Sequence, residues 1–203
     1  MVVDDDPSFL RSTKRLIRAA GFNVLAFESA EEFLRSTLPD APACLVLDVR
    51  LPDWSGLDLQ RQLSRMGLHI PIIFMTGHGD IPMSVQAMKA GAVEFLTKPF
   101  HERDLLVGIQ QAISQARAFR EERMRLTELR GRYESLTPRQ REVMTHVVAG
   151  MPNKVIASEL GTTERTIKFH RGHVMQKMVA SSVADLVRAS AALGGEKPIS
   201  RPH

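Results

Sequence analysis

The chain has 203 residues, of which 43% are apolar and 25% are charged, so it has enough apolar side chains for two small packed domains. This composition excludes wholesale disorder, and no apolar run approaches the roughly 18 residues that a membrane-spanning helix needs. The N-terminus has neither the basic nor the apolar region of a signal peptide, and the single cysteine, Cys44, has no partner for an internal disulfide. We therefore expect a soluble, cytoplasmic protein that does not insert into a membrane.

Charge is distributed unevenly along the chain. Residues 1–112 carry 11 Lys and Arg against 14 Asp and Glu, a net charge of −3, whereas residues 136–203 carry 10 against 5, a net charge of +5. A mildly acidic front half and a basic back half favour nucleic acid as a partner of the back half.

Helical patterns alternate with short apolar runs over the first 112 residues. Apolar residues recur at helical spacing from Phe9 to Ala20, and Gly21 provides a C-terminal cap. Further helices are predicted at 57–66, at 82–90 and from Leu105 onward, and strands at 1–3, 23–27, 44–47, 70–75 and 93–96. The first strand is shorter than the usual five or six residues. This alternation predicts an α/β domain with a doubly wound sheet of five parallel strands covered by helices on both faces.

Residues 113–135 have a different character, with many charges and few apolar side chains. Ala112, Phe119, Leu126 and Tyr133 recur every seven residues. Two interpretations are open: a solvated linker helix, or a short parallel coiled coil between two chains.

Residues 136–193 are predicted to be all-α. The predicted helices run from 137 to 149, from Asn153 to about Leu160, from about 164 to 178 and from about 182 to 193, with caps at Thr137, Asn153 and Thr163 and a capping box over Thr137–Gln140. Gly161 supplies the turn between the second and third of these helices, which suits a helix-turn-helix. The tail from Gly194 is expected to be frayed.

Acidic and polar side chains follow four of the predicted strands. Asp4 and Asp5 follow the first strand, Asp48 the third, Thr76 the fourth and Lys98 the fifth. Because ligands bind beyond the carboxyl ends of the strands in an open parallel sheet, we expect these side chains to lie together. Three close carboxylates repel one another, and a hard cation with oxygen ligands, such as Mg²⁺, relieves the repulsion. A metal ion and a lysine also suit a phosphoryl group, and one carboxylate can then act as the nucleophile that forms an aspartyl phosphate.

These residues lie in four segments that resemble the receiver domain of two-component response regulators, over about residues 1–115: VVDDD at 2–6, LVLDVRLPDWSGLDL at 45–59, MTGHGDI at 75–81 and AVEFLTKPF at 92–100. The resemblance implies a flavodoxin-like fold in which Asp48 accepts a phosphoryl group from a sensor histidine kinase. It also implies that Asp5 and Asp48 bind Mg²⁺ directly, with Asp4 helping through water and the backbone carbonyl of Arg50 as a further ligand.

The same resemblance assigns roles on the last two strands. Thr76 and Phe95 match the pair of residues that switches on phosphorylation. Lys98 matches the lysine that neutralises the phosphoryl oxygens, and the Lys98–Pro99 peptide bond is expected to be cis. Asp6 falls outside the motif and is expected to be solvated.

The third predicted helix of the back half carries the candidate DNA-reading face. At about 100° per residue, one side of this helix is expected to pack inward, with Arg171 at its margin: Ile167, His170, Arg171, Val174 and Met178. The opposite face is placed to read bases in a major groove, and it comprises Arg165, Lys168, Phe169, Gly172 and Gln176. Three further residues are placed to contact phosphates: Lys154, Thr166 and Lys177.

The run LTPRQREVMTHVVAGMPNKVIASELGTTERTIKFHRGHVMQKM at 136–178 is similar to the LuxR-type helix-turn-helix carried by FixJ- and NarL-type regulators, over about residues 136–190. The resemblance implies a recognition helix that starts near Glu164 and dimerisation through the last helix. The apolar residues of that helix supply either a dimer face or the domain's own core: Val183, Leu186, Val187, Ala191 and Leu193. Some members have a basic residue that touches bases at the position of Gly172, so the glycine leaves the preferred DNA sequence open.

We therefore predict a receiver domain at 1–115, a helical linker at 116–135 and a LuxR-type helix-turn-helix domain at 136–203. The predicted function is that of a transcription factor and not of an enzyme. Phosphorylation of Asp48 by a sensor histidine kinase would promote homodimerisation and binding to double-stranded promoter DNA, with RNA polymerase as a further candidate partner.

Two other interpretations are weighed against this prediction. The Asp4-x-Asp6 pair after a strand is faintly similar to the motif of phosphatases that use an aspartyl phosphate. An enzyme of that kind leaves Asp48, Thr76, Lys98 and the basic back half unexplained. The other is a DNA-binding protein whose receiver is a dimer scaffold insensitive to phosphate, which the short first strand favours and the intact acidic motif disfavours.

Overall fold

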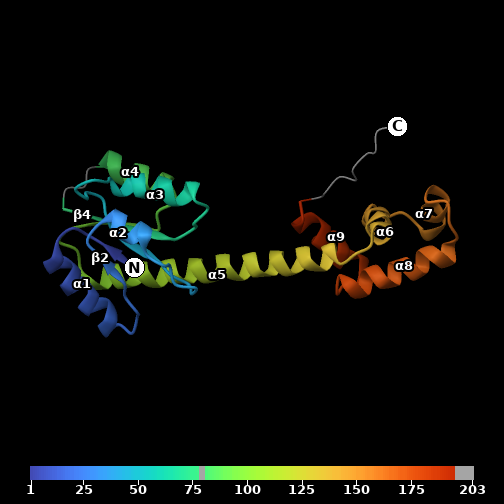
Figure 1. Cartoon of the computed structure of the whole chain (residues 1–203), viewed down its shortest axis with the longest axis horizontal. Coiled ribbons are helices and arrows are strands. Elements are labelled where there is room, and N and C mark those ends of the chain that lie inside the picture. Colours follow the sequence, from blue (N-terminus) through green and yellow to red (C-terminus); the bar gives the residue numbers. More distant parts are fainter. Residues whose placement is uncertain (78–80, 195–203) are drawn as a thin grey trace. The chain divides into compact units, whose positions relative to one another are not determined.

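The computed structural model of the chain describes residues 1–77 and 81–194, which fall into two compact units (Figure 1). The first unit comprises Met1–Arg120 and the second begins at Glu121. Of the predicted features, residues 78–80 of the MTGHGDI segment and the tail 195–203 lie outside the described residues. No helix in the described residues is both long and apolar enough to cross a membrane.

The first unit is a parallel sheet between two layers of helices. Its described strands are β1 (Val2–Val3), β2 (Ala26–Phe27), β3 (Leu45–Asp48), β4 (Ile72–Thr76) and β5 (Glu94–Thr97), and they pair in parallel in the order β2-β1-β3-β4-β5. Its helices are α1 (Pro7–Ala19), α2 (Ala30–Arg35), α3 (Gly56–Arg65), α4 (Ile81–Lys89) and the first part of α5 (Glu102–Glu134). The predicted doubly wound, five-stranded parallel sheet is confirmed.

Apolar side chains cover both faces of this sheet. Helices α2, α3 and α4 close one face through buried residues such as Phe33, Leu59 and Ala87. Helices α1 and α5 close the other face, where Ile17 and Leu105 are buried. Because both faces are covered, strands β1 to β4 are apolar runs that end in a polar residue or are followed by one, as is usual for parallel sheets, whereas β5 begins with the half-buried Glu94.

Strand β2 and helix α2 differ most from the prediction, whereas the bounds of the other elements of the first unit shift by three residues or fewer. Strand β2 contains only Ala26–Phe27 of the predicted 23–27, since its partner β1 offers only Val2 and Val3 for pairing. Helix α2 was not predicted, because its six residues give too little periodicity to read. Local hydrogen bonds define its start: the Ser29 hydroxyl accepts the backbone N–H of Glu32 at 3.1 Å.

Helix α5 is 33 residues long and crosses the boundary between the two units, so the predicted linker 116–135 lies almost wholly within it. Of the four heptad residues, Ala112 is buried in the core of the first unit and Tyr133 packs against that of the second. Phe119 is 46% exposed, although its ring centroid lies 4.9 Å from that of His69 in the first unit. Formation of a coiled coil stays a prediction.

The second unit is a small helical domain. Its core gathers side chains from the end of α5, from α6 (Pro138–Val148), α7 (Asn153–Glu159) and α8 (Glu164–Lys177), and from α9 (Val183–Ala192). The predicted capping box is confirmed at the start of α6, where Thr137 and Gln140 each accept a backbone N–H of the other. Leu186 of α9 is fully buried in this core, whereas Val187 is 42% exposed.

The prediction that Asn153 caps α7 is wrong. The N-cap is Pro152, which has no side-chain capping bond, and Asn153 is the first residue of the helix. Its Oδ1 instead accepts a hydrogen bond from the Arg171 guanidinium at 3.1 Å, which fastens the start of α7 to the middle of α8.

Candidate functional site

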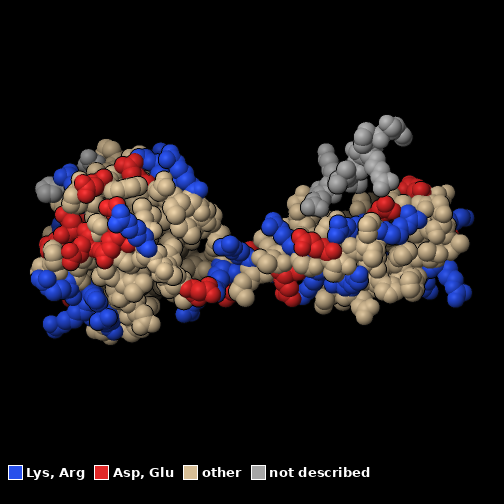
Figure 2. Space-filling model, viewed as in Figure 1, with Lys and Arg blue, Asp and Glu red and all other residues tan. Residues whose placement is uncertain are grey.

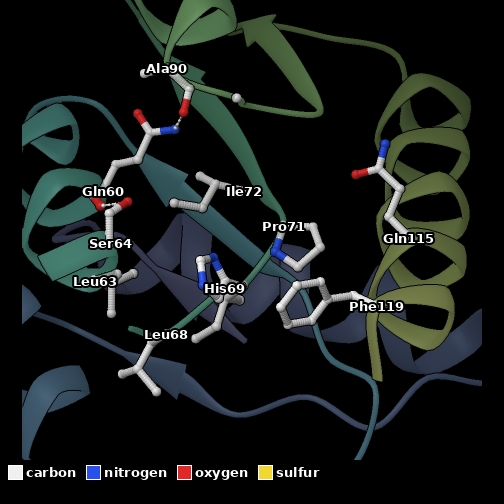
Figure 3. A pocket seen from close by; sticks show the side chains of 12 residues that line it. Gln60, Leu63, Ser64, Leu68, His69, Pro71, Ile72, Ala90, Gln115 and Phe119 are labelled. Carbon is white, nitrogen blue, oxygen red and sulfur yellow. Dashed lines mark hydrogen bonds between the residues drawn. The ribbon is translucent and has the colours of Figure 1, made fainter. Parts of the chain in front are cut away.

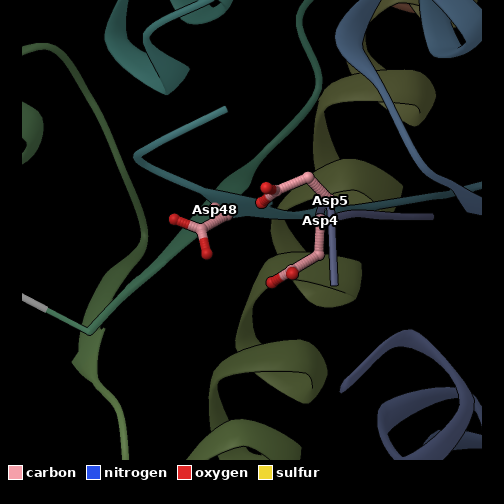
Figure 4. Close-up of side chains that lie close together, drawn as sticks. All are labelled: Asp4, Asp5 and Asp48. Carbon is pink, nitrogen blue, oxygen red and sulfur yellow. The ribbon is translucent and has the colours of Figure 1, made fainter. Parts of the chain in front are cut away.

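The carboxyl ends of the two neighbouring strands β1 and β3 place three carboxylates together. Asp4 and Asp5 follow β1 directly, and Asp48 is the last residue of β3. One carboxylate oxygen from each lies within 4.8 Å of the other two (Figure 4). Asp4 is fully buried and Asp48 is 7% exposed, whereas Asp5 faces solvent. We call these three residues the acidic pocket.

Lys98, from the segment after β5, reaches into the acidic pocket. Its Nζ donates hydrogen bonds to Asp4 Oδ2 at 2.5 Å and to Asp48 Oδ2 at 2.6 Å. The same Nζ lies 3.8 Å from the ring centroid of Phe9 on α1, so the aromatic ring covers one side of the cation. The Lys98–Pro99 peptide bond is cis, as predicted.

Burial and charge act against each other on these groups. Burial raises the pKa of Asp4 above its ordinary value, and the hydrogen bond from Lys98 only partly opposes this effect. Burial also disfavours the charged form of Lys98, but its bonds to Asp4 and Asp48 outweigh burial and raise the pKa of Lys98. The ammonium is therefore held in its charged form by the two carboxylates it bridges.

Backbone N–H groups hold the other oxygens of the two buried carboxylates. Asp48 Oδ1 accepts the N–H of Arg50 at 2.8 Å, and Asp4 Oδ1 accepts the N–H of Asp6 at 3.0 Å. Asp6 is exposed, as predicted, but it also has a structural role that was not predicted. Its carboxylate caps α1 by accepting the N–H groups of Ser8 and Phe9, and these bonds lower the pKa of Asp6.

Gly56 allows α3 to start close behind Asp48. A Cβ at Gly56 would lie 2.6 Å from the backbone oxygen of Asp48 and 3.1 Å from the Cα of Val49, both of them backbone atoms that cannot move aside easily. The sequence gives this glycine no special signal, since only the close approach of two backbones requires it.

Thr76 and Phe95 lie on the neighbouring strands β4 and β5. Thr76 ends β4 and is fully buried, and its backbone oxygen accepts the N–H of Lys98 at 2.7 Å. Phe95 is half-buried, with its ring centroid 6.4 Å from that of Phe74, the residue it pairs with on β4. The structure thus brings Thr76 to the same sheet edge as the acidic pocket and puts Phe95 two residues before that edge.

The acidic pocket has the chemistry of a divalent-cation site. Three carboxylates face the single ammonium of Lys98, which leaves an excess of negative charge when all are ionised. Carboxylate and backbone carbonyl oxygens are the ligands that Mg²⁺ prefers. Asp5 is the exposed member, so a cation could enter from the solvent side.

A second hollow lies at the opposite edge of the sheet, where β4 begins. It has a volume of about 410 Å³ and is lined by residues that include Gln60, Pro71, Ala90 and Phe119, and among its described lining residues there is no Asp, Glu, Lys or Arg (Figure 3). Gln60 Nε2 donates to the Ala90 carbonyl at 3.0 Å across one wall. The hollow lacks the charges that phosphoryl chemistry requires, so it is not the reacting site.

Helices α7 and α8 form the predicted helix-turn-helix, with the turn at Gly161 in a left-handed conformation of φ +60°. Ile167 and Val174 of α8 and its C-cap residue Met178 are buried, as predicted, whereas His170 and Arg171 are only partly buried. The five residues predicted to form its outer face are all exposed: Arg165, Lys168, Phe169, Gly172 and Gln176. Lys154 is exposed as well, and basic side chains are spread over this unit (Figure 2).

Two of the residues predicted to contact phosphates are engaged within the domain. The Lys177 ammonium donates to the Ser135 carbonyl at 2.7 Å and to Gln140 Oε1 at 3.0 Å, so it ties the end of α8 to the start of α6. Thr166 lies within hydrogen-bond distance of the cap residue Thr163, with 2.9 Å between their hydroxyls. A contact between Lys177 and DNA would have to compete with these intradomain bonds.

Residues 1–110 match the family described as response regulator receiver domain, and residues 134–190 match the family described as bacterial regulatory proteins, luxR family. The chain belongs to the response regulators. It is 53% identical to nodulation protein W of Bradyrhizobium diazoefficiens over 95% of this chain and 85% of that protein. It is 40% identical to the transcriptional regulatory protein FixJ of the same organism over 95% of this chain and 94% of that protein. The solved structure of the response regulator StyR is also similar, with 46% identity and a TM-score of 0.84 over 94% of this chain and 96% of that one.

These relatives confirm the predicted class of protein. This response regulator carries a receiver domain and a LuxR-type DNA-binding domain, and it belongs with transcription factors and not with enzymes. The phosphatase-like interpretation of Asp4-x-Asp6 is therefore wrong. The roles of individual residues in the acidic pocket and on α8 remain predictions.

Proposed function

We propose that Asp48 of this response regulator accepts a phosphoryl group from a sensor histidine kinase, and that the receiver then controls DNA binding by the LuxR-type domain. The observation that carries the proposal is the bridge from Lys98 to Asp4 and Asp48 at the carboxyl edge of the sheet. It places a cation beside the carboxylate of Asp48, which is oriented by the backbone N–H of Arg50 and belongs to a residue that is only 7% exposed.

Each residue of the pocket has a separate role in the proposed phosphoryl transfer. A carboxylate oxygen of Asp48 attacks phosphorus, its O–P bond forms as the N–P bond of the phosphohistidine breaks, and the imidazole leaves with the electron pair. Lys98 neutralises one phosphoryl oxygen, and the Thr76 hydroxyl donates to another. Mg²⁺ bound by Asp5, Asp48 and the Arg50 carbonyl, with Asp4 acting through water, would supply the remaining positive charge.

Phosphorylation at the acidic pocket would change the orientation of Phe95 on β5. A near-complete shift between two states needs about 5.5 kcal/mol of differential binding, whereas one charge-assisted hydrogen bond supplies about 1.5–3 kcal/mol. Thr76 and Lys98 together therefore reach this range only narrowly. We propose that homodimerisation through the region 82–112, with Phe95 turning inward, provides the rest.

The proposed division of the chain is a receiver at 1–115, a helical linker at 116–135 and the DNA-binding domain at 136–203. A receiver dimer would bring two α8 helices to paired half-sites on promoter DNA, in the cytoplasm where that DNA lies. Base contacts would come from the outer face of α8, namely Arg165, Lys168, Phe169, Gly172 and Gln176, and phosphate contacts from Lys154, Thr166 and Lys177. RNA polymerase is a further proposed partner.

Titration with beryllofluoride and Mg²⁺, which mimics the acyl phosphate, tests this proposal. We expect gel filtration to show a shift from monomer to dimer and fluorescence anisotropy to show tighter binding to duplex DNA. The Asp48→Asn variant removes the nucleophile with little change in shape and should show neither response. Equal dimerisation and DNA binding by this variant and by treated wild type would instead favour the scaffold interpretation, in which phosphate has no role.

A further inference from the structure

The outer face of α8 presents an aromatic ring to solvent. Phe169 is 64% exposed, although phenylalanine is among the residues most often buried. Its neighbours on this face, Arg165 and Lys168, are cationic and exposed, which suits a nucleic-acid surface. Contact with an apolar group of the nucleic acid would remove this exposed ring from water, which is favourable.

The ring of Phe169 is braced by the next turn of the helix. The ring centroids of Phe169 and His173 are 4.3 Å apart at an interplanar angle of 63°, an edge-to-face arrangement. His173 Nδ1 also lies 3.0 Å from the backbone oxygen of Phe169, so the imidazole is itself positioned. The phenyl ring therefore has a supported orientation, and less side-chain freedom is lost when it meets a partner.

Beside this ring the helix surface is bare. Gly172 lies three residues after Phe169, and a Cβ built on it would meet nothing within 4 Å. With no side chain at Gly172, the edge of a base can approach the helix backbone next to the phenyl ring. The exposed ring of Phe169 therefore lies beside an open position on the helix, where a base edge can contact the ring.

We propose that Phe169 recognises thymine through its C5-methyl group, which makes it a specificity-determining residue of the DNA-binding domain. This inference rests on the proposed function, in which α8 enters the major groove. Among the base edges in that groove, only thymine offers an apolar group. Gly172 contributes because it has no side chain, which leaves room for that base beside the phenyl ring.

The test replaces thymine by deoxyuridine, which removes the methyl group and keeps every hydrogen-bonding atom. The full chain, treated with beryllofluoride and Mg²⁺, first selects duplexes from a random pool. Each thymine of the selected site is then replaced in turn, and affinities are measured for wild type and for Phe169→Ala. We expect one thymine in each half-site at which wild type loses roughly fourfold in affinity, the value for one buried methyl group, while Phe169→Ala loses nothing.

Met124→Ala is the matched control, because Met124 on α5 is 62% exposed and lies outside the proposed DNA-reading face. It should keep the wild-type penalty for deoxyuridine. Since the readout is a ratio of two affinities of one protein sample, partial misfolding of a variant cannot imitate it. An unchanged penalty in Phe169→Ala, or no penalty at any thymine in wild type, would overturn the inference and leave the proposed function standing. Failure of wild type to select any sequence would refute the proposed function itself.

Discussion

Replacing Lys98 by methionine removes the cation that Asp4 and Asp48 share while keeping a side chain of similar length. The two carboxylates are almost fully buried and lie within 4.8 Å of each other. At that separation two negative charges repel by about 3.5 kcal/mol at an effective dielectric constant of about 20. Loss of one partner from a buried ion pair costs about 3–5 kcal/mol. Because the Lys98 side chain is 20% exposed, we expect the lower end, about 3 kcal/mol.

Urea denaturation at pH 7 in EDTA measures this loss for the receiver alone, because Trp54, the single tryptophan, lies in the first unit. Added Mg²⁺ should stabilise both proteins, wild type by about 1.4 kcal/mol at ten times the wild-type Kd, and both proteins are compared at that one Mg²⁺ concentration. The gain should be larger for Lys98→Met, since in wild type the ammonium already occupies Asp4 and Asp48. Lys89→Met, which changes an exposed lysine of α4, is the matched control and should alter neither quantity.

The cost of Lys98→Met should depend on pH in a defined direction. The folded-state pKa of Asp4 is raised, so above that pKa the ionised carboxylate destabilises the folded state. The stability lost in Lys98→Met should therefore become smaller as the pH falls through the folded-state pKa of Asp4. The folded-state pKa of Lys98 is also raised, so in wild type its contribution is complete below pH 10.5 and declines only as the pH rises through the folded-state pKa. A loss below 1 kcal/mol in EDTA, or equal Mg²⁺ effects on both proteins, would contradict the view that Lys98 neutralises this pocket.

Two pairs of substitutions test the close packing and the capping described above. Gly56→Ala should destabilise the receiver by about 1–3 kcal/mol in the same assay, because the new Cβ would press on the backbone oxygen of Asp48. Gly131→Ala, at an exposed helical site where a Cβ meets nothing within 4 Å, should instead stabilise the second unit by up to about 1 kcal/mol. Thr137→Ala should cost that unit about 1 kcal/mol through loss of the α6 cap, measured by circular dichroism, whereas Thr137→Ser should keep most of it.

The receiver site was predictable because its residues sit where strands end. The positions of Asp4, Asp48, Thr76 and Lys98 after apolar runs, combined with a parallel sheet, are sufficient to place them on one edge. The bridging of two carboxylates by Lys98 follows from the same geometry. The role of Gly56 was not predictable, because it depends on how closely the start of α3 approaches the backbone of Asp48. No periodic pattern in the sequence encodes that distance.

The helical half was predictable in its elements but not in its side-chain contacts. Asn153 has the residue type of a cap, but a tertiary bond to Arg171 takes its carboxamide oxygen. Lys177 was predicted to contact DNA phosphates from its place on the surface of α8. In the structure its ammonium instead donates hydrogen bonds to the Ser135 carbonyl and to Gln140 Oε1, near the start of α6. Local propensity could not reveal either bond, since each joins elements that are distant in sequence.

The last turns of α5 decide where the DNA-binding part of the chain can be separated. Leu129 is only 8% exposed and Tyr133 packs beside it, both against the core formed with α6, α8 and α9. A fragment that begins at residue 136, the start of the recognisable motif, would open a hole in that core and expose apolar surface. A fragment that begins at Glu121 keeps both side chains. The unit suited to binding studies, fusion proteins or domain exchange thus begins at Glu121, 13 residues before the family match that starts at residue 134.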